Sequence, residues 1–285
     1  MYTISSIANL RETIKEWRKK GESIAFIPTM GNLHDGHISL VEHALGRTDH
    51  TVVSVFVNPL QFGEGEDYQG YPRTLNADRE QLAIREVDIL FVPNLNEMYP
   101  EGMENHAQVV LPENLTNILC GVSRPTHFAG VTTVVAKLFN IIQPDMAIFG
   151  EKDYQQLFLI KKMVQDLCMP IEVVGKPIIR EKNKLAMSSR NQYLTAAQRE
   201  VAPNLFATLN NMRQRIQDGE RDFDKLTDQA QTTLSELGFK PDYISIRNRD
   251  TLAVATDTDK NLIILAAAYL GKARLLDNIK CSIDA

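Results

Sequence analysis

The stretch that decides how this chain folds is residues 27–41, Ile-Pro-Thr-Met-Gly-Asn-Leu-His-Asp-Gly-His-Ile-Ser-Leu-Val. An apolar run over residues 24–27 ends at Pro28, and a turn with two glycines follows. From His37 onward the apolar residues recur at helical spacing, at Ile38, Val41 and Leu45. This pattern predicts a strand, a loop and the start of a helix.

The loop between that strand and that helix is suited to binding a polyphosphate. The first amides of a helix have no partner within the helix, and the helix dipole is positive at that end. His34 and His37 are three residues apart, so they share a face if the helix starts early, and each can donate to a phosphoryl oxygen as charge builds on it. Gly31 and Gly36 let the backbone come close to a ligand. A single histidine here would be typical of an ordinary surface side chain, but His-x-Gly-His directly after a strand favours a site.

These residues also resemble a known superfamily. His34-Asp35-Gly36-His37 resembles the HIGH signature of the nucleotidyltransferases, and the longer string over residues 28–37 resembles the pantoate–beta-alanine ligase family within that superfamily. We refer to residues 30–37 as the HIGH-like loop. The resemblance implies that ATP contacts all of it: Met30, Gly31, Asn32, Leu33, His34, Asp35, Gly36 and His37.

The composition is that of an ordinary globular protein and gives no general affinity for nucleic acid. At 285 residues, with 44% hydrophobic and 24% charged residues, the chain can form one large or two modest domains. Its formal net charge is -5, so any polyanion must be held by a local site rather than by the whole surface.

The cysteines and the lack of long apolar runs predict a soluble cytoplasmic protein without a membrane partner. Cys120, Cys168 and Cys281 have no CxxC spacing and an odd count, which argues against a disulfide framework or a zinc site. The first residues lack the basic and apolar regions of a signal peptide, and no apolar run approaches the roughly 20 residues that span a bilayer.

A second strand is predicted over residues 52–57, which end at Asn58-Pro59. The next segment leaves the carboxyl end of that strand, where ligands bind in open α/β sheets. Gln61 has both a donor and an acceptor, which suits a hydroxyl and a carboxylate at once, although alone it would be an ordinary turn residue facing water. The resemblance, carried here by residues 56–62, implies that Gln61 contacts pantoate and beta-alanine.

Magnesium is expected from triphosphate chemistry, but no ligand set is evident. Asp78 lies in a helix predicted from Thr74 to about residue 86 and could hold magnesium through water. An exposed helical carboxylate is the commoner explanation for such a residue. Ala77 stands where some relatives have a carboxylate, so the metal ligands stay open.

Arg124 and His127 lie in a predicted loop over residues 121–128. They could bind a phosphate, but we interpret them as anchors of the loop. The resemblance implies that this loop is near the substrate, although Thr126 and Ala129 depart from the glycine and arginine that relatives often carry.

The pattern of strand, glycine turn and helix recurs over residues 146–167. Lys152 in the turn is a compact, flexible cation suited to a phosphoryl oxygen, and Asp153 is a good N-cap. The resemblance implies ATP contacts from Gly150, Glu151, Lys152 and Asp153, and implies that Gln156 holds pantoate.

Residues 185–191, Leu-Ala-Met-Ser-Ser-Arg-Asn, resemble the KMSKS loop of the same superfamily. Two hydroxyls and a guanidinium in a mobile loop can close on a triphosphate and follow its charge into the departing pyrophosphate. Alone, such a segment is typical of a solvated turn, but its pairing with the HIGH-like loop favours a site. The resemblance implies ATP contacts from Ile179, Met187, Ser188, Ser189 and Arg190.

The chain is predicted to form two domains. Residues 1–180 alternate strands and helices, which predicts an α/β, Rossmann-like parallel-sheet domain that binds ATP and pantoate. Residues 181–285 begin with a polar turn and continue with two long amphipathic helices, 201–216 and 223–237, and then three strand-like runs. That order predicts a smaller C-terminal α+β lid domain with an antiparallel sheet.

Taken together, the resemblance implies an ATP-dependent ligase that joins (R)-pantoate to beta-alanine through pantoyl adenylate, with pantothenate, AMP and pyrophosphate as products. The implied catalytic residues are His34, His37, Lys152, Ser188, Ser189 and Arg190. Members of the family are commonly homodimers, so a homodimer that binds small-molecule substrates is expected.

Three alternatives fit the sequence less well. Another HIGH-type adenylyltransferase would use a phosphate-bearing acceptor, which asks for a further basic cluster that we do not find. A fragment of an aminoacyl-tRNA synthetase fits neither the acidic chain nor the lack of an anticodon-binding module. A nucleotide-binding regulatory protein would not need the histidines, Lys152 and Arg190 together.

Overall fold

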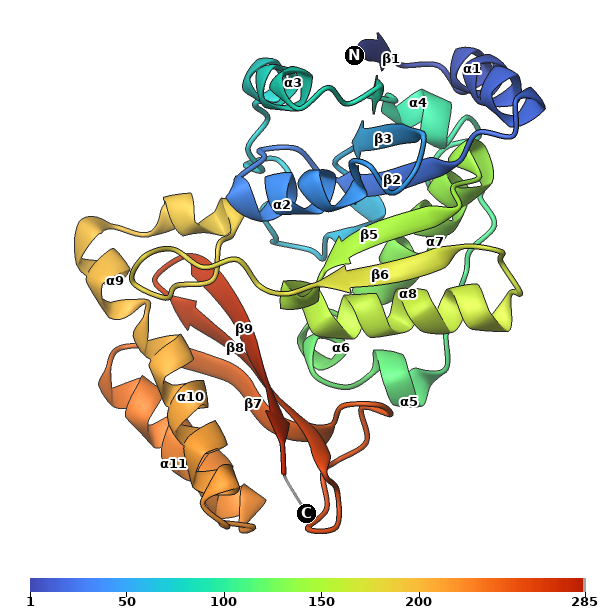
Figure 1. The fold of residues 1–285 in the computed structure, drawn as a ribbon. Helices are drawn as coiled ribbons and strands as arrows, with labels where there is room; N and C mark the ends of the chain where they lie inside the picture. The colour runs from blue at the N-terminus through green and yellow to red at the C-terminus, as the bar shows by residue number, and fades with distance from the viewer. Residues whose placement is uncertain (284–285) are drawn as a thin grey trace. The chain divides into compact units, whose positions relative to one another are not determined.

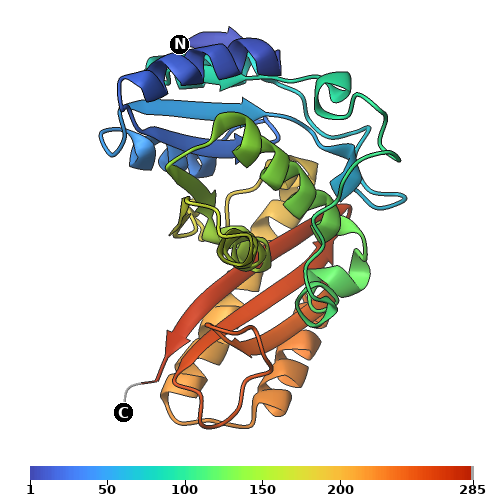
Figure 2. The same cartoon turned by 90° about the vertical axis from the view of Figure 1, so that its right-hand side faces the viewer.

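The computed structural model describes residues 1–283, which divide into two compact units (Figures 1 and 2). The first unit contains residues 1–151 and 156–177. The second unit contains residues 152–155 and the described residues from 178 onward. The chain therefore enters the second unit briefly, returns to the first, and enters the second again at residue 178.

The first unit is built on a six-stranded parallel sheet with the order β1-β4-β3-β2-β5-β6. Its strands are β1 (Tyr2–Ile4), β2 (Ile24–Thr29), β3 (His50–Val55), β4 (Ile89–Phe91), β5 (Met146–Gly150) and β6 (Glu172–Lys176). The inner strands are almost continuously apolar because helices cover both of their faces. The predicted parallel α/β fold is confirmed.

Helices pack on both faces of this sheet (Figure 1). The longer ones are α1 (Ile7–Lys19), α2 (Asp35–Ala44), α3 (Leu75–Ile84), α7 (His127–Ile142) and α8 (Tyr154–Asp166). On one face Ile38 of α2 and Leu82 of α3 share an apolar cluster with Ile27 of β2. On the other face Phe139 of α7 meets the neighbouring strand residue Phe26 edge-on, with 6.3 Å between ring centroids. Adjacent residues of β2 thus bury opposite faces, as the alternation of a strand requires.

The short elements of this unit are the ones that sequence patterns describe least well. They are η1 (Pro59–Gln61), α4 (Leu95–Met98), α5 (Glu113–Thr116), α6 (Cys120–Ser123) and η2 (Glu151–Asp153). One helical turn is too short to show a period, so α6 overlaps the segment predicted as a loop over residues 121–128, and the last two residues of that segment already belong to α7. The strand β1 also escaped prediction, because its three residues at the sheet edge form no buried apolar run.

The second unit contains an antiparallel three-stranded sheet of order β7-β8-β9, with two helices, α10 and α11, packed on one face (Figures 1 and 2). Its elements are η3 (Ser189–Tyr193), α9 (Ala196–Val201), α10 (Asn204–Gln217), α11 (Phe223–Glu236), β7 (Lys240–Asn248), β8 (Asn261–Leu270) and β9 (Ala273–Ser282). Leu209 of α10, Leu234 of α11 and Ile264 of β8 share its core. The predicted α+β arrangement is confirmed. Pro203 lies between α9 and α10 because it has no N–H to continue the helix.

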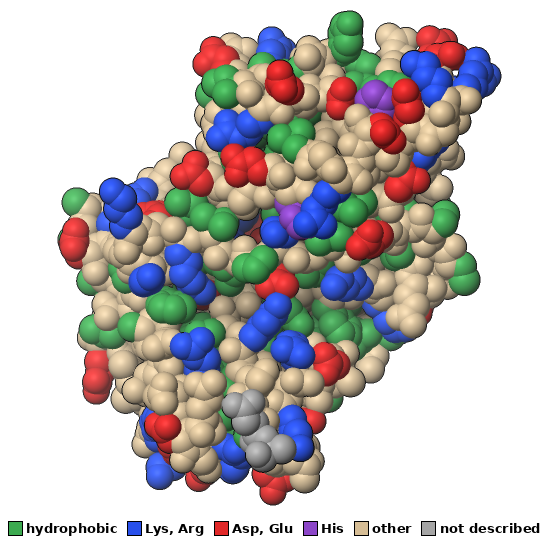
Figure 3. Space-filling view, in the orientation of Figure 1, with side chains coloured by type: hydrophobic (Ala, Val, Ile, Leu, Met, Phe, Trp, Pro, Cys, Tyr) green, Lys and Arg blue, Asp and Glu red, His purple; other side chains and the backbone are tan. Residues whose placement is uncertain are grey.

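Acidic and basic side chains are interspersed over the face of the molecule in Figure 3. Within residues 1–283, no helix is both long enough and apolar enough to cross a membrane.

Candidate active site

Three loops leave the sheet of the first unit at the carboxyl ends of neighbouring strands. β2 lies between β3 and β5 and runs parallel to both. The chain proceeds from β2 outward to β3 and β4 on one side, and later to β5 and β6 on the other. β2 is therefore the topological switch point, where parallel α/β sheets bind ligands. The HIGH-like loop, the loop that contains Gln61 and the Gly150-Glu151 turn all begin there.

His34 and His37 together form the start of α2. His34 is the N-cap, and its Nδ1 accepts from the N–H of Gly36 at 3.1 Å. In return the Nδ1 of His37 accepts from the N–H of His34 at 3.4 Å, and the ring centroids are 4.1 Å apart. Because Nδ1 accepts in both rings, we place the proton of each neutral imidazole on Nε2. Each ring thus carries an Nε2–H donor at a helix N-terminus, where the dipole also favours an anion.

Asp78 fixes the backbone of the HIGH-like loop through hydrogen bonds. The expectation of an exposed helical carboxylate was wrong, because Asp78 is only 1% exposed. Its Oδ2 accepts from the N–H of Asn32 at 3.0 Å, and its Oδ1 accepts from the N–H of Leu33 at 2.8 Å and from the Thr74 hydroxyl at 3.1 Å. The available signal was spacing: Asp78 precedes the fully buried Leu82 by one helical turn, which puts both on the inner face of α3.

The turn that Asp78 holds leaves no room for a side chain at Gly31. Both Gly31 and Asn32 have positive φ, 81° and 51°. A Cβ atom at Gly31 would lie 2.9 Å from Cγ1 of Val55 and 3.1 Å from Oδ2 of Asp78. Glycine is therefore needed at residue 31 both for its backbone conformation and for its size.

Gln61 lies in η1, directly after β3, and its side chain reaches the HIGH-like loop. Its Nε2 donates to the Sδ of Met30 at 3.0 Å, and its Oε1 accepts from Nδ2 of Asn58 at 3.3 Å. Asn58 is buried and is itself held by the Tyr99 hydroxyl and the Gly130 carbonyl. The carboxamide of Gln61 therefore lies beside Met30 of the HIGH-like loop.

Arg124 and His127, interpreted from the sequence as anchors of their own loop, both contact the backbone of Gln61. Nη2 of Arg124 donates to the Gln61 carbonyl at 3.2 Å, and Nδ1 of His127 lies 2.7 Å from the same oxygen. Nε and Nη2 of Arg124 also donate to Oε1 and Oε2 of Glu66, at 2.5 and 2.6 Å. Burial would raise the pKa of Glu66, but the hydrogen bonds and charge of Arg124 outweigh it and lower that pKa.

The turn after β5 is divided between the two units. Gly150 and Glu151 belong to the first unit, as does Gln156 in α8, whereas Lys152 and Asp153 belong to the second. Nζ of Lys152 lies 3.6 Å from Oδ1 of Asp153. The Lys152 carbonyl accepts from Nδ2 of Asn278, on β9, at 3.0 Å.

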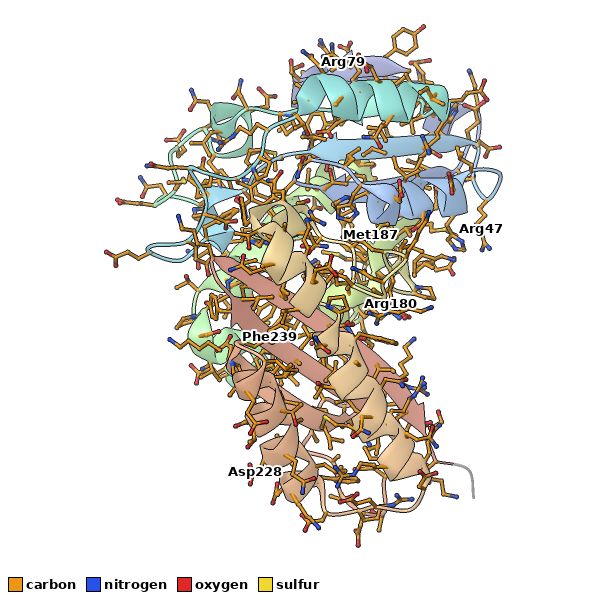
Figure 4. All side chains as sticks on the ribbon, turned by 90° about the vertical axis from the view of Figure 1, so that its left-hand side faces the viewer. Arg47, Arg79, Arg180, Met187, Asp228 and Phe239 are labelled. Atoms are coloured by element: carbon orange, nitrogen blue, oxygen red, sulfur yellow. The ribbon has the colours of Figure 1, made fainter. Side chains whose placement is uncertain are left out.

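The KMSKS-like segment begins in a short hairpin of the second unit. The N–H of Met187 donates to the carbonyl of Ile179 at 3.0 Å, which pairs two residues predicted to contact ATP. Ser188 then caps η3, and its Oγ accepts from the N–H of Arg190 at 3.2 Å. Figure 4 labels Arg180 and Met187, which lie on the two arms of this hairpin. We refer to residues 187–190 as the Met-Ser-Ser-Arg loop.

The predicted site residues therefore form two groups, one on each unit. The first group contains the HIGH-like loop, Gln61, Gly150, Glu151 and Gln156. The second contains Lys152, Asp153, Ile179 and the Met-Ser-Ser-Arg loop. The sequence did not reveal which polar residues hold these groups, since nothing in a local pattern shows a hydrogen bond to a distant segment: the buried Asn58, Asp78, Asp277 and Asn278, and the partly buried Arg180.

The carboxylates near the first group are not arranged as a metal centre. Both oxygens of Asp78 are directed at backbone amides and a hydroxyl. Among residues 1–283 no three His, Cys, Asp or Glu side chains are placed to hold a metal ion together. A preformed magnesium site therefore does not fit the donors that this unit offers.

Comparison with known proteins gives matches along nearly the whole chain. A family model described as pantoate-beta-alanine ligase matches residues 2–280. A protein of Shewanella baltica (strain OS185) named pantothenate synthetase is 53% identical over 280 residues, which cover 98% of this chain and 99% of that protein. A pantothenate synthetase of Hahella chejuensis is 51% identical over 279 residues, with 98% of each chain covered.

Solved structures match as well. The pantothenate synthetase from Thermus thermophilus has 44% sequence identity and a TM-score of 0.91, with 98% of this chain and 99% of that chain covered. The pantoate-beta-alanine ligase from Francisella tularensis, complexed with beta-gamma ATP and beta-alanine, has 36% identity and a TM-score of 0.81, with 98% and 97% covered.

Proposed function

The chain belongs to the pantoate–beta-alanine ligase family, and we propose on that premise that its site joins pantoate to beta-alanine with cleavage of ATP. The products are pantothenate, AMP and pyrophosphate. The observation in this chain that best supports the proposal is the pair of imidazoles at the N-terminus of α2. Their Nδ1 atoms accept from backbone N–H groups, which leaves the proton of each ring on Nε2, at the start of the helix that follows the switch-point strand β2.

The first step forms pantoyl adenylate. A carboxylate oxygen of pantoate attacks the α-phosphorus of ATP, and the bond from that phosphorus to the bridging oxygen breaks to release pyrophosphate. His34 and His37 donate from Nε2 to the phosphoryl oxygens as charge accumulates on them. Removing one such donor from a preorganised site lowers the rate by about 10²- to 10³-fold.

The second unit supplies the cationic and hydroxyl donors for the phosphates. Lys152 and Arg190 carry the positive charge, and Ser188 and Ser189 add hydroxyls that follow the charge into the departing pyrophosphate. The remaining contacts to ATP come from Gly150, Glu151, Asp153, Ile179 and Met187. This unit acts as a lid, and it protects an acyl adenylate that water would otherwise hydrolyse.

The second step uses the adenylate as an activated acid. The amine of beta-alanine attacks the acyl carbon, the bond to the AMP oxygen breaks, and the amine loses a proton. Gln61 and Gln156 orient pantoate through both steps. No covalent intermediate with the protein is required, because adenylation itself supplies a good leaving group. Alignment of the bound reactants can contribute ~7–11 kcal/mol to such a step.

Magnesium enters the site with its nucleotide. Because both oxygens of Asp78 are already bonded to backbone amides, we take MgATP as the substrate form. The protein functions in the cytoplasm as a homodimer that binds neither nucleic acid nor membranes. Sedimentation equilibrium tests the dimer, since a monomer has a mass of 32.1 kDa.

The decisive experiment follows pyrophosphate release from MgATP. Pantoate alone should give release limited to about one equivalent of enzyme-bound adenylate. Adding beta-alanine should give steady turnover, with equal amounts of AMP and pantothenate. Protein that binds ATP but releases no pantoate-dependent pyrophosphate would refute the proposal.

A further inference from the structure

We propose that Asp277 and Asn278 are positioning residues that join Lys152 and the Met-Ser-Ser-Arg loop into one rigid assembly within the second unit. This inference rests on the proposed function, since it assigns a purpose to residues said there to bind phosphate. Neither residue is expected to touch the substrates. They act through the backbone of Lys152 and through Arg180 at the base of the loop's hairpin.

The two residues are unusual for a strand because both are polar and both are buried. They are adjacent on β9, and they are 4% and 5% exposed. A buried carboxylate without partners is strongly destabilising, so its retention requires a set of compensating bonds. Successive side chains of a strand point to opposite faces, which lets one pair reach two different segments.

Asp277 holds the hairpin that carries the Met-Ser-Ser-Arg loop. Its two oxygens accept from Nη1 and Nη2 of Arg180 at 2.7 and 2.8 Å, the bidentate geometry that fixes a guanidinium in one orientation. Arg180 also donates to the Lys184 carbonyl at 3.1 Å, and its guanidinium lies 4.0 Å from the centre of the Phe206 ring. Both arms of the hairpin are therefore tied to β9 through one side chain.

The other end of the loop is fixed to the same hairpin. Asn191 is buried, and its Nδ2 donates to Oε1 of Glu181 at 2.9 Å and to the carbonyl of Ala186 at 3.0 Å. Arg199 donates to the Asn191 carbonyl at 2.9 Å. The Met-Ser-Ser-Arg loop thus has an anchored residue on each side.

Asn278 extends the assembly to Lys152. Its Nδ2 donates to the Lys152 carbonyl at 3.0 Å, and its own N–H donates to Oδ1 of Asp277 at 2.7 Å. Burial raises the pKa of the Asp277 carboxyl, and the charges of Arg180 and Lys152 oppose that rise. Residues 152–155 belong to the second unit, although their neighbours in sequence belong to the first. Lys152 and the Met-Ser-Ser-Arg loop are therefore parts of the same unit and are joined through β9.

The test measures whether a substitution on β9 acts through Lys152. Asn278→Ala removes the bond to the Lys152 carbonyl, and one lost hydrogen bond of this kind corresponds to about a tenfold effect. We expect kcat/KM for ATP in pyrophosphate release to fall by about tenfold, while KM for beta-alanine stays within about twofold. Asp242→Asn is the matched control: it weakens a partly buried ion pair with Arg274 on the same sheet, with 2.6 Å between Oδ2 of Asp242 and Nη2 of Arg274.

A double mutant identifies the route of the effect. In a Lys152→Ala background there is no ammonium left to position, so Asn278→Ala should change kcat/KM by less than about twofold, whereas independent effects would multiply. Asp242→Asn should lower the melting temperature without this dependence on Lys152. If Asn278→Ala does not fold, Arg180→Lys serves instead, because it keeps the charge and loses the bidentate contact.

Binding of the nonhydrolysable analogue α,β-methylene-ATP separates this inference from the proposed function. A wild type that binds the analogue but shows no turnover refutes the function, and an Asn278→Ala variant with about tenfold weaker binding still supports the positioning role. Equal losses in Asn278→Ala and Asp242→Asn, or multiplicative effects with Lys152→Ala, overturn the positioning role even if wild-type turnover is normal.

Discussion

At the scale of single residues, several side chains of the first unit serve structure and chemistry together. His34 caps α2 through Nδ1, and in our proposal it also donates to the ligand from Nε2–H. Asp78 does not bind the ligand in our proposal, but it sets the backbone that carries both histidines. The structural role and the chemical role of such a side chain can be separated by a substitution that keeps one role and removes the other.

Replacing His34 by asparagine should separate the cap from the donor. Asn is among the best N-cap residues, so the free energy of unfolding should change by less than about 0.5 kcal/mol, whereas His34→Ala should lose about 1 kcal/mol. Both variants lack the imidazole and should lose about 10²-fold in pyrophosphate release. Thermal melting and single-turnover rates measured on the pair check this, and normal release by His34→Asn would contradict it.

Glu66 should make the stability of the first unit sensitive to acid. Its pKa is lower in the folded than in the unfolded chain, so its stabilising effect is present above its ordinary pKa and is lost as the pH falls through the folded value. At pH 7 the free energy of unfolding of Glu66→Gln should therefore be roughly 1.5 kcal/mol lower than that of the wild type, because a charged hydrogen bond is weakened. This gap in stability should close as the pH falls. Glu80→Gln, an exposed change on α3, should show no such gap at any pH.

At the scale of elements, periodicity predicted the long helices and inner strands because each buries a whole stripe or face. The HIGH-like loop and the glycine turn after β5 were also predictable, since their residue types directly follow strand ends. The extent of β9 was not: its apolar pattern stops at Leu276, yet the strand continues because Arg180 compensates the burial of Asp277. The burial of Asp78 was not predicted either, because its partners Asn32 and Leu33 are distant in sequence.

The contact between α7 and η1 depends on Gly130. A Cβ atom there would lie 2.3 Å from the Leu60 carbonyl oxygen and 2.8 Å from the Gln61 nitrogen. Gly130→Ala should displace η1, cost about 1–3 kcal/mol of stability, and raise KM for pantoate more than KM for ATP. Gly70→Ala, whose nearest contact would be 3.9 Å away, is the matched control in steady-state assays and melts. An unchanged KM for pantoate would refute the link between η1 and pantoate.

At the scale of the whole molecule, the two units are joined by three passages of the chain, at residues 151–152, 155–156 and 177–178. The order of the sequence therefore does not follow the order of the units. Residues 152–155 belong to the second unit even though they follow a strand of the first, so we expect their stability to depend on the core of the second unit.

Hydrogen exchange should reveal that dependence. Leu209 is fully buried in the core of the second unit, and Leu209→Ala should destabilise that core by about 2–5 kcal/mol. Exchange at residues 152–155 should accelerate together with β8, while the amides of β2 stay as protected as in the wild type. Ile27→Val, in the core of the first unit, should weaken protection in β2 instead. Unchanged exchange at residues 152–155 in Leu209→Ala would show that they are held by the first unit.

The bond from Asn278 to the Lys152 carbonyl also restricts how such a chain can be recombined. A hybrid made by one crossover near residue 178 would combine residues 152–155 of one parent with β9 of the other. The two partners of this bond would then come from different parent proteins. If the parents differ at both partners in ways that compensate one another, the hybrid would lose that compensation. If the second unit is exchanged between relatives, residues 152–155 must therefore be exchanged with it. This requires two additional junctions, at residues 151–152 and 155–156.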